Sequence, residues 1–174
     1  MESKQPKFRI GRLDHVHIRV PDRDAAARWY SQHLGFEPVD EYDFWATAVD
    51  GGPLQISADG GNTMLALFET SDGHPMVPQS NGVAFSVDAD TFIAFVRSLP
   101  GEIDHTSGGP LRPDHIVDFD LCWAIDLVDP WGNQYEINCS AYEQIRAELI
   151  EADAIEAVRY WPPDLRRTYL DSRP

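Results

Sequence analysis

Apolar and polar residues alternate strictly along two segments of the chain, residues 13–20 (LDHVHIRV) and residues 82–87 (GVAFSV). Alternation with a period of two is typical of a β-strand with one buried face. The first segment has Val16, Ile18 and Val20 on its apolar face and His15, His17 and Arg19 on its polar face. The second has Val83, Phe85 and Val87 on its apolar face and only small residues opposite. Both segments are therefore predicted to be strands.

A helical pattern follows each strand. In the first half, Asp22 is a predicted N-cap and Gly35 a predicted stop signal, and apolar residues recur between them near helical spacing. In the second half, Asp90 is the predicted cap. Apolar residues then recur at i, i+3, i+4 and i+7 until Pro100-Gly101 ends the pattern. Each half thus begins with a strand and a helix.

Short strands and glycine-rich turns complete each half, which closes on a strand at residues 64–69 or 133–138. His15 and Glu69 are 54 positions apart (69 − 15), and so are Gly82 and Glu136 (136 − 82). This equal spacing predicts two superposable βαβββ modules, with His15 over Gly82 and Glu69 over Glu136.

A C-terminal helix is predicted over residues 141–160. Ser140 and Glu143 have the spacing of a capping box. Tyr142, Ile145 and Leu149 then form an apolar stripe. The stripe has two interpretations: it packs on its own domain, or it forms the interface of a homodimer.

Composition narrows the class of protein. Hydrophobic residues make up 43% of the chain, which predicts a globular core. No apolar run approaches the roughly 18 residues of a membrane span, and residues 1–10 lack the apolar stretch of a signal peptide, so we expect a cytoplasmic protein. The formal net charge of −15 disfavours nucleic acid and anionic membrane as partners.

Two longer runs identify a family resemblance. LDHVHIRVPDRDAAARWYSQHLGFEPV resembles the opening strand and helix of a vicinal oxygen chelate module, and LVDPWGNQYEIN resembles its closing hairpin. The resemblance implies an α+β fold in which two tandem βαβββ modules, at 10–70 and 82–140, pair their curved sheets around a cleft. With the helix at 141–160 they would make one vicinal oxygen chelate domain.

The resemblance also implies a metal site. In this superfamily the first and last strands of each module supply the ligands, at positions that correspond here to His15, Glu69, Gly82 and Glu136. Gly82 has no side chain, so the implied ligands are His15, Glu69 and Glu136. One imidazole and two carboxylates suit a divalent ion such as Mn, Ni, Fe(II) or Zn.

Plainer interpretations compete at several of these positions. His15 and Glu136 would equally suit a solvated sheet face, and Glu69 would lie in water if its strand frayed into the following turn. His17, on the face of His15, is predicted to contact substrate, replace a ligand or simply line the cleft. Arg19 is predicted to hold an anionic substrate, and the competing interpretation is a surface ion pair.

Three functions follow from the resemblance. The first is a glyoxalase-like enzyme, a metal-assisted lyase or isomerase in which Glu69 or Glu136 moves a proton on a small oxygenated substrate. The second is a metal-free protein of bleomycin-resistance type that sequesters a small molecule. The third is an extradiol-type dioxygenase, which the missing His at position 82 disfavours.

Overall fold

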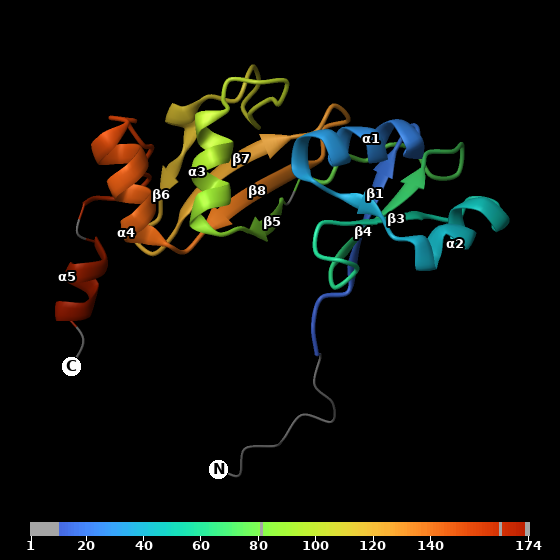
Figure 1. Cartoon of the computed structure of the whole chain (residues 1–174), viewed down its shortest axis with the longest axis horizontal. Coiled ribbons are helices and arrows are strands. Elements are labelled where there is room, and N and C mark those ends of the chain that lie inside the picture. Colours follow the sequence, from blue (N-terminus) through green and yellow to red (C-terminus); the bar gives the residue numbers. More distant parts are fainter. Residues whose placement is uncertain (1–10, 81, 164, 173–174) are drawn as a thin grey trace, which may run out of the picture. The chain divides into compact units, whose positions relative to one another are not determined.

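The computed structural model describes residues 11–80, 82–163 and 165–172. The chain divides into two compact units, Met1–Val77 (unit 1) and Pro78–Pro174 (unit 2), and each has its own sheet (Figure 1). Residues 1–10 lie outside the described residues, and with them the predicted start of the first module and the stretch compared with signal peptides. Within the described part of the chain, no helix is long and apolar enough to cross a membrane.

Unit 1 is a βαβββ module with one short helical insertion. Its sheet has the order β1-β4-β3-β2, in which β1 runs parallel to β4 and the other pairs are antiparallel (Figure 1). The elements in chain order are β1 (His15–Val20), α1 (Arg23–Leu34), β2 (Glu37–Pro38), η1 (Asp40–Tyr42), α2 (Asp43–Ala48), β3 (Leu54–Ser57) and β4 (Met64–Glu69).

Unit 2 repeats the βαβββ order and adds a helical tail. Its sheet has the equivalent order β5-β8-β7-β6, with β5 parallel to β8. The elements are β5 (Val83–Ser86), α3 (Ala89–Arg97), η2 (Pro113–His115), β6 (Val117–Asp118), β7 (Trp123–Val128), β8 (Gln134–Cys139), α4 (Tyr142–Ile145), η3 (Arg146–Ala152) and α5 (Leu165–Asp171). The predicted α+β class and module order are confirmed.

Helices α1 and α3 each begin where an Asp side chain accepts a hydrogen bond from a free backbone N–H. As predicted, Asp22 caps α1 by accepting a hydrogen bond from the Ala25 N–H at 2.8 Å, and Gly35 ends the helix in the left-handed conformation. In α3 the cap is Asp88, which accepts from the Thr91 N–H at 2.8 Å. The predicted cap, Asp90, already lies in the first turn.

Each helix covers the apolar face of its own sheet. Helix α1 buries Ala26, Ala27 and Tyr30, and the strands beside it bury Ile18 and Val20 completely. Helix α3 does the same in unit 2 with Phe92, Ile93 and Val96. Burying a large aliphatic or aromatic side chain contributes roughly 1.5–3 kcal/mol, so these contacts fix which face of each sheet remains for a site.

The C-terminal helix is shorter than predicted. It begins after Ala141, whose side chain makes no capping bond, so the predicted capping box is wrong. Helix α4 continues as the π-helical η3 and ends at Ala152, after which Val158 forms a bridge with Val117 of β6. The predicted extent to residue 160 is therefore also wrong.

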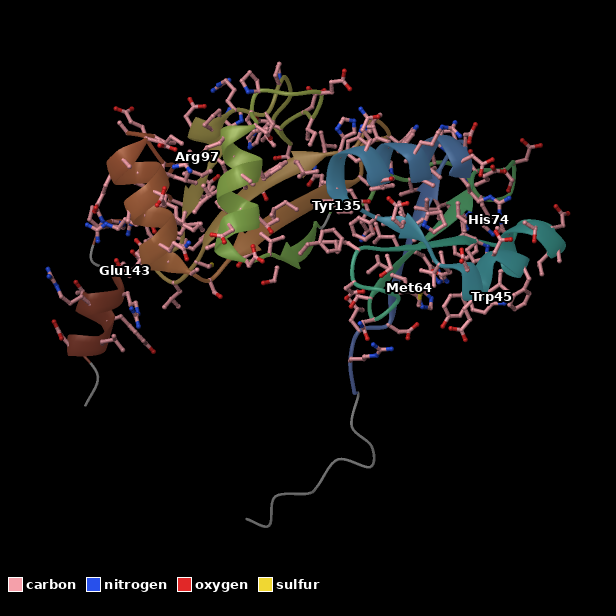
Figure 2. All side chains as sticks on the ribbon, viewed as in Figure 1. Trp45, Met64, His74, Arg97, Tyr135 and Glu143 are labelled. Carbon is pink, nitrogen blue, oxygen red and sulfur yellow. The ribbon has the colours of Figure 1, made fainter. Side chains whose placement is uncertain are left out.

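The apolar stripe of this helix packs on unit 2. Ile145 and Leu149 are fully buried, and the ring of Tyr142 stacks on Trp123 at 5.1 Å between centroids. Arg97 extends from α3 to the same helix, where it pairs with Glu148 at 2.9 Å and Asp153 at 2.7 Å (Figure 2). The stripe that motivated a homodimer is thus occupied by its own unit.

Candidate functional site

Strand register shows which positions pair within the sheet of each unit. His17 of β1 pairs with Ala66 of β4, and Ala84 of β5 pairs with Glu136 of β8. Two residues before His17 stands His15, and two residues before Ala84 stands Gly82, immediately ahead of β5. If His15 corresponds to Gly82, as predicted, the pairing within each sheet makes Ala66 the counterpart of Glu136.

The pairing of Glu69 with Glu136 was wrong because the two halves differ in length. Corresponding residues are 67 positions apart at the first strand (82 − 15) and 70 apart at the last strand (136 − 66). Unit 2 thus has three more residues between these strands than unit 1. Glu69 and Glu136 are therefore not equivalent positions, although each lies 54 residues after the first-strand position of its own half.

Glu69 lies far from His15. His15 pairs with Met64 at one end of the β1–β4 ladder, and Glu69 pairs with Val20 at the other end, about 16 Å away at the usual rise per residue. Alternation also places Glu69 on the opposite face of the sheet, the face that α1 covers. The two side chains therefore cannot bind one ion.

The Glu69 carboxylate instead joins the start of α1. It accepts a hydrogen bond from the Arg23 N–H at 3.3 Å and lies 3.6 Å from the Arg23 Nε. Its side chain is 48% exposed although β4 continues through Glu69, so the exposure does not come from fraying of the strand. Arg19 donates to the Glu69 main-chain oxygen at 3.3 Å and lies over the Phe68 ring, and its role in substrate binding remains a prediction.

His15 and His17 bring two imidazole rings together on one face of β1. Their Nε2 atoms are 3.0 Å apart, and the Nδ1 of His15 lies 2.8 Å from the Asp14 carboxylate. The edge of the His17 ring meets Phe68. Burial, together with the neighbouring charges of His15 and Arg19, lowers the pKa of His17.

The row of residues across each sheet differs in chemistry. In unit 1 the row is His17, Ala66 and Gln55, because Gln55 of β3 pairs with Ala66. The Gln55 side chain is only 2% exposed, and its Oε1 atom accepts no hydrogen bond within the described residues. In unit 2 the equivalent row is Ala84, Glu136 and Asp126. One row supplies nitrogen and amide groups and the other supplies two carboxyl groups.

The carboxyl row of unit 2 lines a hollow of about 250 Å³. The residues around it are Ser80, Gly82, Ala84, Thr106, Asp126, Gln134, Tyr135 and Glu136. Glu136 accepts a hydrogen bond from Asn138 at 3.1 Å. Burial raises the pKa of Asp126, and the charge of His105 partly opposes this shift. None of the ion pairs among the described residues includes either carboxylate.

Asp126 was missed at the sequence level, although a signal was present. Its strand alternates Trp123, Ile125 and Leu127 with smaller or polar residues, which places Asp126 on the face opposite the core. Only the register of β7 against β8 shows that this face brings it beside Glu136.

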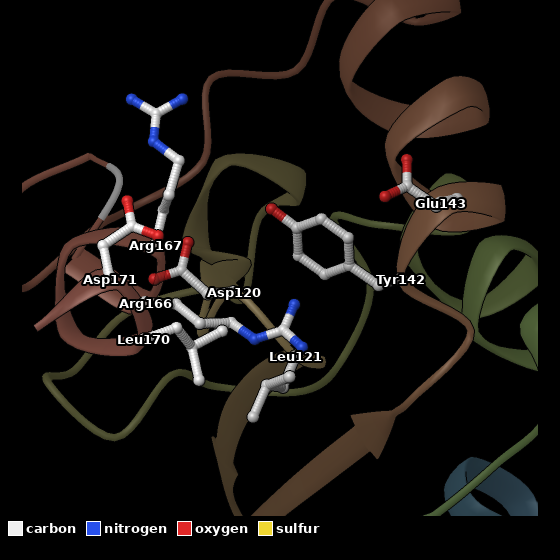
Figure 3. Close-up of a pocket in the computed structure, with 8 residues that line it drawn as sticks. All are labelled: Asp120, Leu121, Tyr142, Glu143, Arg166, Arg167, Leu170 and Asp171. Carbon is white, nitrogen blue, oxygen red and sulfur yellow. The ribbon is translucent and has the colours of Figure 1, made fainter. Parts of the chain in front are cut away.

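A larger hollow of about 390 Å³ lies beside the tail of unit 2 (Figure 3). Its polar groups mainly hold the tail in place. Asp120 accepts hydrogen bonds from Arg159 and from the Trp161 indole, and the Tyr142 hydroxyl donates to Asp118 at 3.0 Å. We therefore place the candidate site in the smaller hollow, where the carboxylates are not paired with a cation.

The chain departs from the four-ligand metal centre that the family resemblance implies. The corresponding positions are His15, Ala66, Gly82 and Glu136, of which only the first and last have a donor side chain. Over the described residues, no group of three or more His, Cys, Asp or Glu side chains is arranged to hold a metal ion. The residues present do not fit that centre.

The sequence profile of the Glyoxalase/Bleomycin resistance protein/Dioxygenase superfamily matches residues 12–99. The chain belongs to this superfamily. Sequences of curated proteins give no match. Solved structures with the same fold include TnmS3, an antibiotic binding protein from Streptomyces sp. CB03234, at 20% identity over 77% of this chain and 99% of that one, with a TM-score of 0.53.

Two further structures of this superfamily fold have different activities in their names. FosX, a fosfomycin resistance protein from Listeria monocytogenes, is 15% identical over 79% of this chain and 99% of its own, with a TM-score of 0.51. The oxidase ChaP-H2 is 24% identical over 76% of this chain and 95% of its own, with a TM-score of 0.52. At these identities the likeness shows the fold, and the function has to be argued from the site.

Proposed function

We propose that this superfamily member is a small-molecule-binding protein of bleomycin-resistance type, with its ligand in the hollow of unit 2. One observation carries the proposal: Ala66 and Gly82 occupy two of the four positions that would supply metal ligands. A protein that holds a small molecule by direct contacts does not need metal-ligating side chains at all four of these positions. The antibiotic-binding neighbour TnmS3 has the same fold and provides a precedent for sequestration.

The hollow favours a ligand with a cationic or hydrogen-bond-donating group. Gly82 and Ala84 leave space beside Glu136, and Asp126 stands opposite it. Like charges on opposite strands destabilise a sheet, so a bound cation or donor would relieve this repulsion. The net charge of −15 attracts cations to the surface as a whole.

Calorimetry on EDTA-treated protein tests the proposal. A library of amine-containing small molecules is compared with N-acetylated analogues, which lack the positive charge. We expect metal-independent binding of amines that weakens at least tenfold in Glu136→Gln and in Asp126→Asn. Glu143→Gln, an acidic position of the same unit outside the hollow, is the control. Binding that requires added metal, or that both variants leave unchanged, would contradict the proposal.

The second candidate is the metal-assisted lyase or isomerase acting on a small oxygenated substrate. It is favoured by His15 and Glu136, which keep donors at two of the four positions. Glu136, on an open sheet face, would be the base that takes a proton, and Glu69 has no part in this version because it is held by Arg23. Turnover that appears on addition of Mn, Ni, Fe(II) or Zn and is lost in Glu136→Gln would favour this candidate.

A further inference from the structure

The segment between α3 and β6 forms a hairpin, residues 103–111, at the edge of the hollow of unit 2. Backbone hydrogen bonds close the hairpin, and Asp104 bridges Val128 of β7 in the antiparallel sense. This direction carries Thr106 towards Asp126 along the same edge of β7, and both residues line the hollow. The hairpin is therefore part of the wall of the proposed ligand site.

Two imidazole rings connect this hairpin to η2. The ring of His105 in the hairpin meets the ring of His115 in η2, with centroids 4.2 Å apart and both side chains half-buried. His115 is followed directly by the fully buried Ile116, so it is the fixed side of the contact. We infer that the contact is a pH-sensitive clamp: protonation of the pair loosens the hairpin and releases a cationic ligand from the hollow. The release rests on the proposed function, and the clamp itself does not.

Backbone hydrogen bonds show that the clamped state requires neutral rings. The Ser107 N–H donates to Nδ1 of His105 at 3.2 Å, and the Arg112 N–H donates to Nδ1 of His115 at 3.3 Å. An amide N–H can only donate, so each Nδ1 keeps its lone pair and each ring carries its proton on Nε2. The Ser107 hydroxyl, 2.6 Å from Nδ1 of His105, suits either state of that ring. A proton added at either Nδ1 removes a backbone hydrogen bond.

Repulsion between the rings acts in the same direction, because two imidazolium charges at this separation disfavour each other. Arg112 and Asp114, on the His115 side, pair with each other at 3.0 Å and leave little net charge to offset the repulsion. On the His105 side the charged neighbour is Asp126. Burial, followed by the charges of His105 and Arg112, lowers the pKa of His115, and Asp114 partly opposes this shift. The folded state therefore resists the proton that would open the clamp.

Protonation would weaken cation binding in two ways. A positive charge on His105 beside Asp126 competes with a bound cation for the same carboxylate. Loosening of the hairpin also removes Thr106 from the wall of the hollow. Both effects have the same sign, so a cationic ligand should be held near neutral pH and released on acidification. Because linkage is reciprocal, a bound cation should in turn favour the neutral rings.

Hydrogen exchange on the ligand-free protein tests the clamp. The amides of His105 and Leu111 close the hairpin, and their protection factors already correct for the effect of pH on the intrinsic exchange rate. We expect these factors to fall about tenfold from pH 7.5 to pH 5.5, the range in which His changes charge. His115→Gln removes the titrating group and should abolish the fall, and His105→Gln provides the same test from the other ring. His33→Gln, in α1 of unit 1, is the control and should behave as wild type.

Calorimetry with benzyltrimethylammonium, whose charge does not depend on pH, tests the coupling to the hollow. In EDTA-treated protein its affinity should fall about tenfold over the same pH range. His115→Gln should reduce this fall to less than about threefold. The change that remains in this variant reports Asp126, whose own pKa is raised by burial.

Each outcome separates the clamp from the proposed function. Protection that does not change with pH in the wild type, or that falls equally in His115→Gln, would overturn the clamp. Affinity that falls equally in wild type and His115→Gln would overturn its coupling to the hollow. If the probe binds at neither pH while the wild-type hairpin still loses protection, the clamp is supported and the proposed function alone is contradicted.

Discussion

Asp126 of β7 lies directly opposite Glu136 of β8, so that two carboxyl groups face each other across one pair of strands. Burial raises the pKa of Asp126 above its ordinary value of 3.8, and the folded protein therefore holds this proton to higher pH than the unfolded chain does. Protonation of Asp126 therefore favours the folded state, and this contribution to stability is present at low pH. It is lost as the pH rises from about 3.8 through the pKa of the folded state.

Replacing Asp126 by Asn should therefore stabilise the protein at neutral pH. Removing one of two facing charges should raise the free energy of unfolding by roughly 0.5–1 kcal/mol at pH 7, or about 1–4 °C in Tm. The gain should disappear near pH 3.5, where the wild-type carboxyl is protonated. Calorimetric unfolding at both pH values measures the effect, and a gain that is equal at both would show that the charge is not its cause.

Gly52 leaves no room for a side chain. A Cβ atom at this position would clash with the main-chain oxygen of Trp45 in α2. Because the obstacle is backbone, Gly52→Ala should cost roughly 1–3 kcal/mol. Gly73→Ala, where a Cβ meets nothing within 4 Å, is the matched control in unit 1. Urea unfolding that showed equal stability for both variants would contradict the prediction.

Arg159 holds the tail of unit 2 through Asp118 and Asp120. Arg159→Met would remove the cation that pairs with both of these mostly buried carboxylates, and should destabilise the protein by roughly 2–4 kcal/mol. Arg112→Met breaks the exposed pair with Asp114 and should cost less than about 1 kcal/mol. Thermal unfolding of the two variants compares them directly. Similar losses in both would show that burial does not strengthen the tail network.

Asn133 is a fully buried residue at the turn between β7 and β8. It donates to Asp129 at 2.8 Å and accepts from the Gln79 N–H at 2.9 Å. Asn133→Ala removes both of these side-chain hydrogen bonds from a buried turn, which should cost roughly 2–4 kcal/mol. Asn62→Ala, in the exposed turn of unit 1, should cost less than about 1 kcal/mol. Chemical denaturation tests the difference, and equal costs would exclude burial as its reason.

The sequence predicted the local elements well, because each depends on neighbouring residues. The alternation in β1 and β5 predicted both strands, and Asp22 and Gly35 marked the ends of α1. The order of strands and helix in each half then gave the module. These signals need no knowledge of what the rest of the chain contacts.

The site was predicted less well, because it depends on register between distant strands. The turns before β4 and β8 held the missing signal. In each turn an Asp carboxylate accepts from the N–H four residues later: Asp59 from Thr63 at 2.9 Å and Asp129 from Asn133 at 2.8 Å. Aligning these two Asp residues gives the offset of 70 (129 − 59) and pairs Ala66 with Glu136. The equal spacing of 54 ignored these turns.

The C-terminal helix shows a second limit of prediction from the sequence. Tyr142, Ile145 and Leu149 form a stripe whose spacing is the same whether it binds a second protein or its own sheet. Only the stacking of Tyr142 on Trp123 and the burial of the other two decide the matter. Periodicity identifies an apolar face, and long-range packing determines what covers it.

In each sheet, the strand that comes last in the sequence occupies an inner position. Strand β4 lies between β1 and β3, and β8 lies between β5 and β7. During synthesis, neither sheet acquires its connecting strand until the end of its module has been translated. A nascent chain that stops before residue 64 exposes the edges of β1 and β3, which are unpaired and open to aggregation. Neither sheet can therefore be joined into one piece before its last strand has been synthesised.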